Sequence, residues 1–222
     1  MFNSIAPRYD LINHLFSLQI DRSWRRKAMR MVEPTPAMRL LDVACGTGDF
    51  AMAAYDRGVR HVVGIDISGE MVEVGRLKVA DRGLSEAIQL CEGDSEQIDH
   101  ADGSFDVVTV GFGVRNFEHL EVGMREMCRV LKPGGKAIVL EFSMPRCFVV
   151  RWAYLFYFRC FMPFVAGLIS GNKQAYEYLP DSVMKFPHGD AFLEVMKRCG
   201  YVECAARPVS LGIATIYTAI KP

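Results

Sequence analysis

Residues 40–51 read LLDVACGTGDFA, an apolar run followed by a turn that contains two glycines. Parallel strands that are buried on both faces have such runs of Val and Leu. Glycines at a strand-to-helix turn let a ligand approach the backbone closely, and they expose free N–H groups at the start of the next helix. A bare tight turn has the same letters, so the segments around it decide between the two. We expect a ligand against Gly46 and Gly48.

Further runs rich in Val, Ile and Leu follow the first one, so that the expected strands are 40–44, 61–66, 87–94, 105–112 and 137–142. Helical patterns lie between them. In 68–82, Ser68 is the expected N-cap and apolar residues recur every third position. In 118–131, a stripe of Leu and Met recurs until the Pro-Gly-Gly of 133–135 ends it. The alternation predicts βαβ units and an α/β fold with a parallel sheet.

The chain is expected to form one domain. Its 222 residues suit a single domain of ordinary size, and half of them are hydrophobic. Residues 201–219 predict two closing strands, with Gly212 at a turn or bulge. The stretch Glu-Pro-Thr-Pro at 33–36 separates a basic N-terminal arm from the sheet.

Composition excludes several classes of protein. The 26 basic and 26 acidic residues balance, which disfavours a nucleic-acid binder. The seven cysteines form no CxxC pair and lie near no histidine at zinc spacing, so we expect reduced thiols and no metal. The first ten residues, MFNSIAPRYD, lack the apolar core of an export signal, and a cytoplasmic location is expected.

Acidic residues stand at the ends of the next two expected strands. Asp66 ends the second strand and can accept both hydroxyls of a ribose, or it can cap the following helix. Asp94 ends the third strand and suits an adenine amino group, or it forms a turn. Because the carboxyl ends of parallel strands share one edge of a sheet, these residues predict a nucleoside site there.

Two nucleoside ligands fit this pattern. Gly46 to Ala51 satisfies GxGxxG/A, so a nicotinamide dinucleotide has to be considered. Asp42 and Asp49, however, place carboxylates around a turn where a pyrophosphate needs neutral or positive surroundings. A sulfonium cation is favoured by the same charges. A dinucleotide enzyme also needs more chain for a substrate domain, so S-adenosylmethionine fits better.

The successive motifs carry a resemblance to known enzymes. Class I S-adenosylmethionine-dependent methyltransferases have motifs that resemble LDVACGTGD, VVGIDIS, CEGDSE, FDVVTV and RVLKPGG. The ubiquinone/menaquinone C-methyltransferase family has more specific blocks that resemble MFNSIAPRYDLIN, GFGVRNFE, VLEFSMP, AYEYLPDSV and GIATIY. The resemblance runs from Phe2 to Tyr217. It implies a Rossmann-like fold with a seven-stranded, mostly parallel sheet, helices on both faces and a reversed terminal hairpin.

The resemblance also implies how the chain is divided and where the cofactor binds. One methyltransferase domain would cover 1–222, with an N-terminal lid over 1–36 and a helical insert on the substrate side over 145–190. Some family members have serine where this chain has Gly111, and Ala44 replaces the commoner first glycine of the turn. Together with the residues above, the expected cofactor contacts are Tyr9 in the lid, Asp42, Gly46, Thr47, Gly48, Asp66, Asp94, Ser95 and Gly111.

The implied reaction is C-methylation of a polyprenylated quinol, with S-adenosylmethionine as methyl donor. We expect demethylmenaquinol as the acceptor, with the benzoquinol precursor of ubiquinone as the alternative. A nicotinamide-dependent reductase, a nucleoside-binding module without activity and a methyltransferase of water-soluble acceptors are the rivals. A sulfonium is already an activated electrophile, so positioning does most of the work and no metal is needed.

The expected catalytic residues are Arg115 and Asn116. A guanidinium is a poor base, but it can stabilise a quinol oxyanion or hold a water that takes the proton. Arg115 could instead form a structural ion pair with Glu118 or Glu141, and Asn116 could cap the next helix. A wall for the quinone is expected from Tyr176, Tyr178 and Ser182, which could equally belong to an ordinary core.

Two segments suggest contact with a membrane surface. Residues 147–169 are apolar except for two arginines, a proline and a glycine. This pattern predicts an apolar helical insert rather than a helix that spans the membrane. Residues 1–32 hold six basic and two acidic residues, which anionic headgroups would attract. A core-packing insert and a solvated basic helix are the simpler alternatives. We expect peripheral contact at the inner face of the cell membrane.

Overall fold

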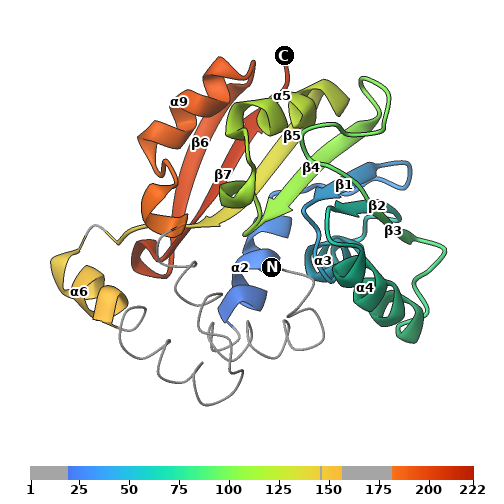
Figure 1. Ribbon diagram of the computed structural model, residues 1–222. Helices are drawn as coiled ribbons and strands as arrows, with labels where there is room; N and C mark the ends of the chain where they lie inside the picture. The colour runs from blue at the N-terminus through green and yellow to red at the C-terminus, as the bar shows by residue number, and fades with distance from the viewer. Residues whose placement is uncertain (1–19, 146, 157–181) are drawn as a thin grey trace.

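A mostly parallel sheet is the centre of the molecule (Figure 1). The computed structural model describes residues 20–145, 147–156 and 182–222, and within them seven strands have the order β3-β2-β1-β4-β5-β7-β6. Only β7 runs against its neighbours β5 and β6. The strands are β1 (Arg39–Val43), β2 (His61–Asp66), β3 (Ile88–Glu92), β4 (Phe105–Gly111), β5 (Leu131–Phe142), β6 (Val202–Val209) and β7 (Ala214–Ile220).

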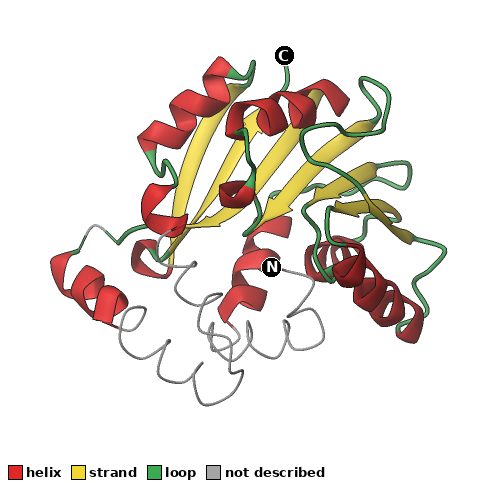
Figure 2. Cartoon of the chain, in the orientation of Figure 1, coloured by secondary structure: helices red, strands yellow, loops and turns green. Residues whose placement is uncertain are grey.

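Helices cover both faces of this sheet (Figure 2). The described helices are α2 (Ile20–Met29), α3 (Asp49–Arg57), α4 (Gly69–Asp81), α5 (Leu120–Val130), α6 (Phe148–Phe156) and α9 (Asp190–Arg198). One core cluster joins the sheet to α2, α3 and α4 through residues such as Trp24, Phe50 and Val72. A second cluster joins the opposite face to α5 and α9 through Met127 and Phe192. The predicted fold class is therefore confirmed.

The strand and helix predictions agree with the structure within a few residues at most ends. The strand at 61–66 and the N-cap Ser68, whose Oγ accepts a hydrogen bond from the Met71 amide at 3.3 Å, are confirmed. The tail forms the expected hairpin, with Gly212 in the turn between β6 and β7. The third strand is shorter than predicted and ends at Glu92.

The strand at 137–142 begins earlier than predicted, because β5 starts at Leu131. Phe105 pairs with Leu131 and Val107 pairs with Lys136, so the residues between Leu131 and Lys136 bulge out of register opposite a single residue of β4. Gly134 has a φ of 74°, which a glycine adopts without strain and which lets the chain loop out here. The Pro-Gly-Gly stretch thus ends α5 and at the same time forms a bulge inside a strand.

The strand order reverses between β1 and β4. From β1 the chain builds outward to β2 and β3, and from β4 it builds the other way to β5 and the hairpin. Ligands of open α/β sheets bind outside the carboxyl ends of the strands at such a reversal. The segments that follow β1 and β4 are therefore where a site is expected.

The two predicted subregions are described in part. Of the lid at 1–36, residues 1–19 lie outside the described residues, and α2 packs Trp24 and Met29 into the core. Of the insert at 145–190, residues 146 and 157–181 lie outside them, and α6 and a short helical stretch at 182–185 are described. None of the helices in the described ranges is long and apolar enough to cross a membrane.

Candidate functional site

The turn after β1 is held in an unusual backbone conformation. Gly46 and Gly48 have positive φ of 54° and 79°, and Ala44 also has a positive φ, of 50°. A Cβ on Gly48 would lie 2.9 Å from Leu90 Cδ1, so the turn packs closely against a side chain of β3. Ala44 bears the strain that a glycine would avoid, which is about 1–2 kcal/mol. The turn is thus shaped by tertiary contacts as well as by its glycines.

Asp66 joins this turn to the start of α4. Its Oδ2 accepts a hydrogen bond from the Gly46 amide at 2.8 Å, and its Oδ1 accepts one from the Ser68 amide at 2.9 Å. Burial raises the pKa of Asp66, and the two amide hydrogen bonds oppose that rise. Each carboxylate oxygen has a second lone pair, so a ribose hydroxyl can still be accepted. The structure therefore gives Asp66 a role in the turn that is compatible with the predicted ribose contact.

Asp42 is a buried carboxyl group beneath the turn. Its Oδ1 accepts a hydrogen bond from the Thr109 hydroxyl at 2.8 Å, whereas its Oδ2 has no hydrogen-bond partner among the described residues. Burial is the main reason why the pKa of Asp42 is raised to about 7. A cation bound at this edge would favour the charged form of the carboxyl group. The chemistry of this buried acid thus fits a sulfonium ligand.

Thr47 and Asp49 meet a lysine that the sequence analysis did not consider. Lys78 Nζ donates to Thr47 Oγ1 at 2.9 Å and to Asp49 Oδ1 at 2.6 Å. Arg25 Nη1 lies 3.7 Å from Asp49 Oδ2. The charge of Asp49 is therefore balanced, and the electrostatic argument against a pyrophosphate rests on Asp42. No sequence signal marked Lys78, because a lysine on the last turn of a helix, as here on α4, is an ordinary complement to the helix dipole.

Asp94 does not end a strand, and that prediction is wrong. It lies two residues beyond β3 and is exposed, and its Oδ1 accepts a hydrogen bond from the Glu96 amide at 2.8 Å, as a turn-forming Asp does. The Gly93 amide donates to the Asp66 carbonyl at 2.9 Å, so the segment with Asp94 and the half-buried Ser95 begins beside the end of β2. The strand stops early because Asp94 opens a turn, in which the Gln97 amide donates to the Asp94 carbonyl at 3.3 Å.

The segment after β4 packs directly on the turn after β1. A Cβ on Gly113 would lie 2.5 Å from the Ala44 Cβ, and one on Gly111 would lie 2.8 Å from Phe50 Cδ1. Neither position has room for a side chain unless its neighbours move. The close approach brings the 3-10 turn at Val114–Asn116, which carries Arg115, to the same edge of the sheet as the glycines.

Arg115 forms its ion pair with Glu141 and not with Glu118. Arg115 Nη1 lies 2.7 Å from Glu141 Oε1, and Arg115 Nε donates to Ser182 Oγ at 3.3 Å. Glu141 is completely buried. Glu141 was one of the two partners that the sequence left open, and the structure decides between them.

The remaining predicted residues are placed as follows. Asn116 does not cap α5, because His119 occupies the N-cap position. The Asn116 backbone amide instead donates to the Gly113 carbonyl at 2.9 Å, within the 3-10 turn. Ser182 is buried against Arg115. Tyr9, Tyr176 and Tyr178 lie outside the described residues.

Comparisons with known proteins show the family of the chain and relate its fold to that of methyltransferases. Residues 1–221 match the model of the ubiE/COQ5 methyltransferase family. The chain is 43% identical to a demethylmenaquinone methyltransferase of Bacteroides fragilis, over 100% of this chain and 91% of the relative. It is 46% identical to a ubiquinone/menaquinone biosynthesis C-methyltransferase of Geotalea daltonii, over 100% and 94%. In fold it is similar to a putative S-adenosyl-L-methionine-dependent methyltransferase of Methanococcus maripaludis, with a TM-score of 0.72, 18% identity and coverage of 100% and 94%.

Proposed function

The chain belongs to the ubiE/COQ5 methyltransferase family, and from this we propose that it transfers the methyl group of S-adenosylmethionine to a ring carbon of demethylmenaquinol. The observation that carries the proposal is 43% identity along the whole chain to a relative named for that reaction. Membership of this family excludes the nicotinamide-dependent reductase. The benzoquinol precursor of ubiquinone is the second candidate acceptor, because the relative with 46% identity is named for both pathways.

The residues at the sheet edge support a division of labour. S-adenosylmethionine, when bound, supplies a methyl group that its sulfonium has already activated. Asp66 would hold the ribose, and the buried charge of Asp42 would complement the sulfonium. Arg115 would stabilise the quinol oxygen that loses its proton, which raises the electron density at the unsubstituted ring carbon. The hydroxyl proton would pass to water, and the S–CH3 bond would break, leaving its electron pair on sulfur, as the new C–C bond forms. The ring proton would then pass to water and the quinol oxygen would take a proton back, which restores the aromatic ring.

The test of this function is product analysis. The protein would be incubated with isotopically labelled S-adenosylmethionine and a panel of acceptors: demethylmenaquinol, the benzoquinol precursor and a water-soluble catechol. Mass spectrometry then locates the label. We expect C-methylated menaquinol. O-methylation, or turnover of the catechol alone, would contradict the proposal.

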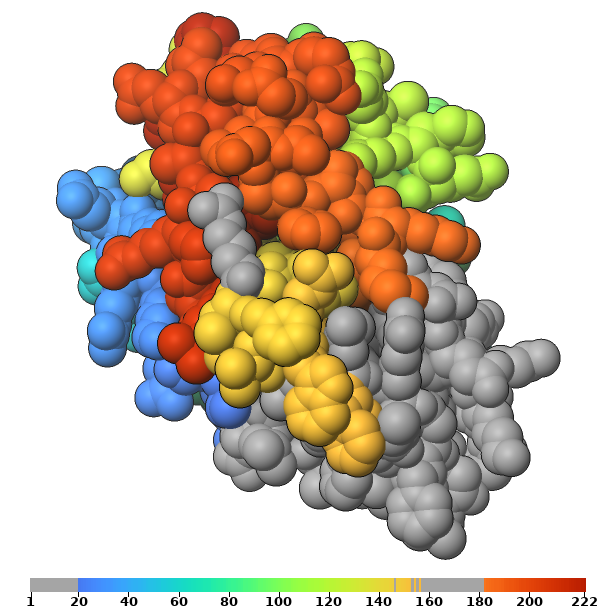
Figure 3. Space-filling view, turned by 90° about the vertical axis from the view of Figure 1, so that its left-hand side faces the viewer, coloured from blue at the N-terminus to red at the C-terminus, as the bar shows by residue number. Residues whose placement is uncertain are grey.

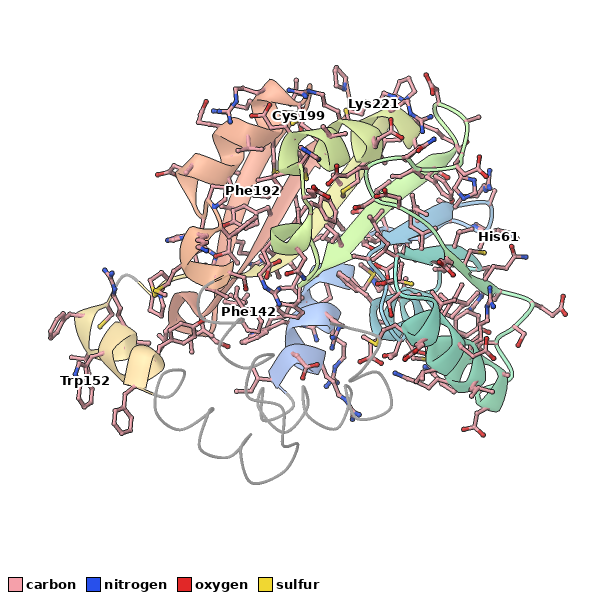
Figure 4. The ribbon with its side chains drawn as sticks, viewed as in Figure 1. His61, Phe142, Trp152, Phe192, Cys199 and Lys221 are labelled. Atoms are coloured by element: carbon pink, nitrogen blue, oxygen red, sulfur yellow. The ribbon has the colours of Figure 1, made fainter. Side chains whose placement is uncertain are left out.

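The polyprenyl tail of such a substrate requires an apolar surface, and α6 has an exposed apolar face. Large exposed fractions are found for Phe148 (80%), Val149 (70%), Trp152 (64%) and Phe156 (55%). Figure 3 shows α6 on the outer face, and Figure 4 shows Trp152 on its outer side. The rings of Trp152 and Phe156 stack at 5.8 Å. We propose that this face rests on an anionic membrane surface, to which the exposed basic residues of α2, Arg22, Arg26 and Lys27, would be drawn.

Vesicle sedimentation tests the membrane contact. We expect the protein to sediment with vesicles of mixed neutral and anionic phospholipid, and to do so less at high salt because the charges are screened. Trp152→Glu should reduce sedimentation about tenfold, since the substitution puts a charge into the interface. Leu77→Glu is the matched control, because Leu77 is 65% exposed on α4, far along the chain from α6. Equal sedimentation of wild type and Trp152→Glu would contradict the contact.

A further inference from the structure

The hydrogen bonds of Arg115 divide its guanidinium into an occupied and an unoccupied part. Nη1 donates to Glu141 Oε1 at 2.7 Å and to the Phe112 carbonyl, and Nε donates to Ser182 Oγ at 3.3 Å. Within the described ranges no residue accepts a hydrogen bond from Nη2. Because a guanidinium has five N–H donors in a rigid plane, fixing Nε and Nη1 also fixes the position of Nη2.

Glu141 is bound to this arginine through both of its oxygens. Besides the ion pair, Glu141 Oε2 accepts a hydrogen bond from the Arg115 backbone amide at 3.4 Å. Burial raises the pKa of Glu141, and the neighbouring Arg115 opposes that rise. The side chains of Glu141 and Arg115 are 0% and 8% exposed. The guanidinium also lies over the Phe142 ring, 5.5 Å from its centroid.

Such a buried pair is poor evidence for a role in stability. Removing two charges from water costs several kcal/mol, and well-packed apolar residues of the same size often stabilise a protein more. What the pair does provide is orientation. The pair holds Nη1 of the guanidinium against the protein and leaves the two N–H donors of Nη2 for another acceptor.

We propose that Glu141 is a positioning residue for methyl transfer, which holds Arg115 so that its two Nη2 donors meet the oxygen of the quinol acceptor. This inference rests on the proposed function and adds to it a residue that does not itself touch substrate. Ser182, on the other side of the guanidinium, assists by binding Nε.

The pH dependence of turnover separates positioning from folding. A well-placed Arg115 lowers the pKa of the bound quinol hydroxyl, because the guanidinium favours the oxyanion. Other titratable groups lie nearby, because Glu141 also interacts electrostatically with the buried hydroxyls of Tyr154 on α6 and Tyr217 on β7. A variant with a misplaced Arg115 should need a higher pH to reach half of its maximal kcat. A variant that is only less well folded loses activity without that shift.

The experiment compares Glu141→Gln with the wild type on demethylmenaquinol. We expect kcat to fall about 10- to 100-fold, its pH midpoint to rise by about one unit, and the Kd for S-adenosylmethionine to stay within about twofold. Ser182→Ala, which leaves the buried charge pair intact, should shift the midpoint in the same direction by less. Glu126→Gln is the matched control, because it removes another Glu–Arg pair, with Arg129 at 2.8 Å, from α5. We expect it to leave kcat and the midpoint unchanged.

The outcomes keep the two proposals apart. If the wild type forms no C-methylated quinol, the proposed function fails and takes this inference with it. If the wild type is active and neither Glu141→Gln nor Ser182→Ala moves the pH midpoint, only the positioning role of Glu141 is overturned. If Arg115→Met retains wild-type turnover, Arg115 does not meet the acceptor, and Glu141 has nothing to position.

Discussion

Asp42 has a buried environment that the sequence does not reveal. In the sequence it is one of several acids near a glycine turn. In the structure it is 1% exposed, hydrogen-bonded on one oxygen to Thr109, and its pKa is raised to about 7 by burial. At neutral pH it therefore lies close to the point where it gains its charge. A bound cation would draw it to the ionised form.

The burial of Asp42 should make the free energy of unfolding depend on pH. The pKa of Asp42 in the folded state is above its ordinary value, so its contribution to stability is complete below about pH 4 and is lost as the pH rises through 7. Between these limits the free energy of unfolding of the wild type should fall relative to Asp42→Asn, by up to about 4 kcal/mol. Urea denaturation at pH 4, 6 and 8 measures it. Parallel curves for the two proteins would show that Asp42 ionises normally.

Asp66 gives a prediction for binding. Asp66→Ala should weaken the affinity for S-adenosylmethionine by about 1–3 kcal/mol, because the ribose hydroxyls lose their acceptor. The amides of Gly46 and Ser68 lose theirs too, so the melting temperature should also drop. Asp66→Asn keeps one acceptor oxygen and should lie between the two proteins. An unchanged affinity by titration calorimetry would remove the ribose assignment.

At the scale of elements, the site depends on two turns that touch. The segment after β4 reaches the turn after β1 because Gly113 has no side chain, and the Ala44 methyl group fills the space. Ala44 itself has a positive φ of 50°. The contact between the turns thus coexists with local backbone strain, a combination often found at functional sites.

Gly113→Ala tests this contact. The new methyl group would overlap the Ala44 Cβ, so we expect the free energy of unfolding to fall by about 1–3 kcal/mol and turnover to fall with it. Gly69→Ala is the control. Gly69 opens α4, and a Cβ there would meet only the end of the Glu92 side chain, at 2.8 Å. That variant should be neutral or slightly stabilised, since Ala is the better helix former. Equal stability of both variants would mean that the turns are free to separate.

At the scale of the whole molecule, the strand order creates the site. The reversal between β1 and β4 brings together a turn at residues 44–48 and a segment at residues 112–116 that lie far apart in the chain. A ligand bound at this junction would contact segments from both halves of the sheet. Its binding should therefore stabilise the domain as one unit.

A thermal shift measures that stabilisation. S-adenosylmethionine at about 100 times its Kd should add about 2.7 kcal/mol to the free energy of unfolding. For a domain of this length the melting temperature should rise by roughly 5–10 °C. NADH at the same concentration should leave it unchanged. A rise with NADH alone would contradict the choice of ligand that Asp42 and the family support.

The sequence by itself determined the order of strands and helices, the cap at Ser68 and the glycine turn, because periodicity, capping and turn chemistry act between near neighbours in the chain. Only the tertiary structure decided which charges meet. Arg115 pairs with Glu141, 26 residues away, and Lys78 neutralises Asp49, 29 residues away. Asp42 owes its raised pKa to burial by elements from several parts of the chain. Such distances and burial follow from how the sheet is assembled, and no local pattern encodes them.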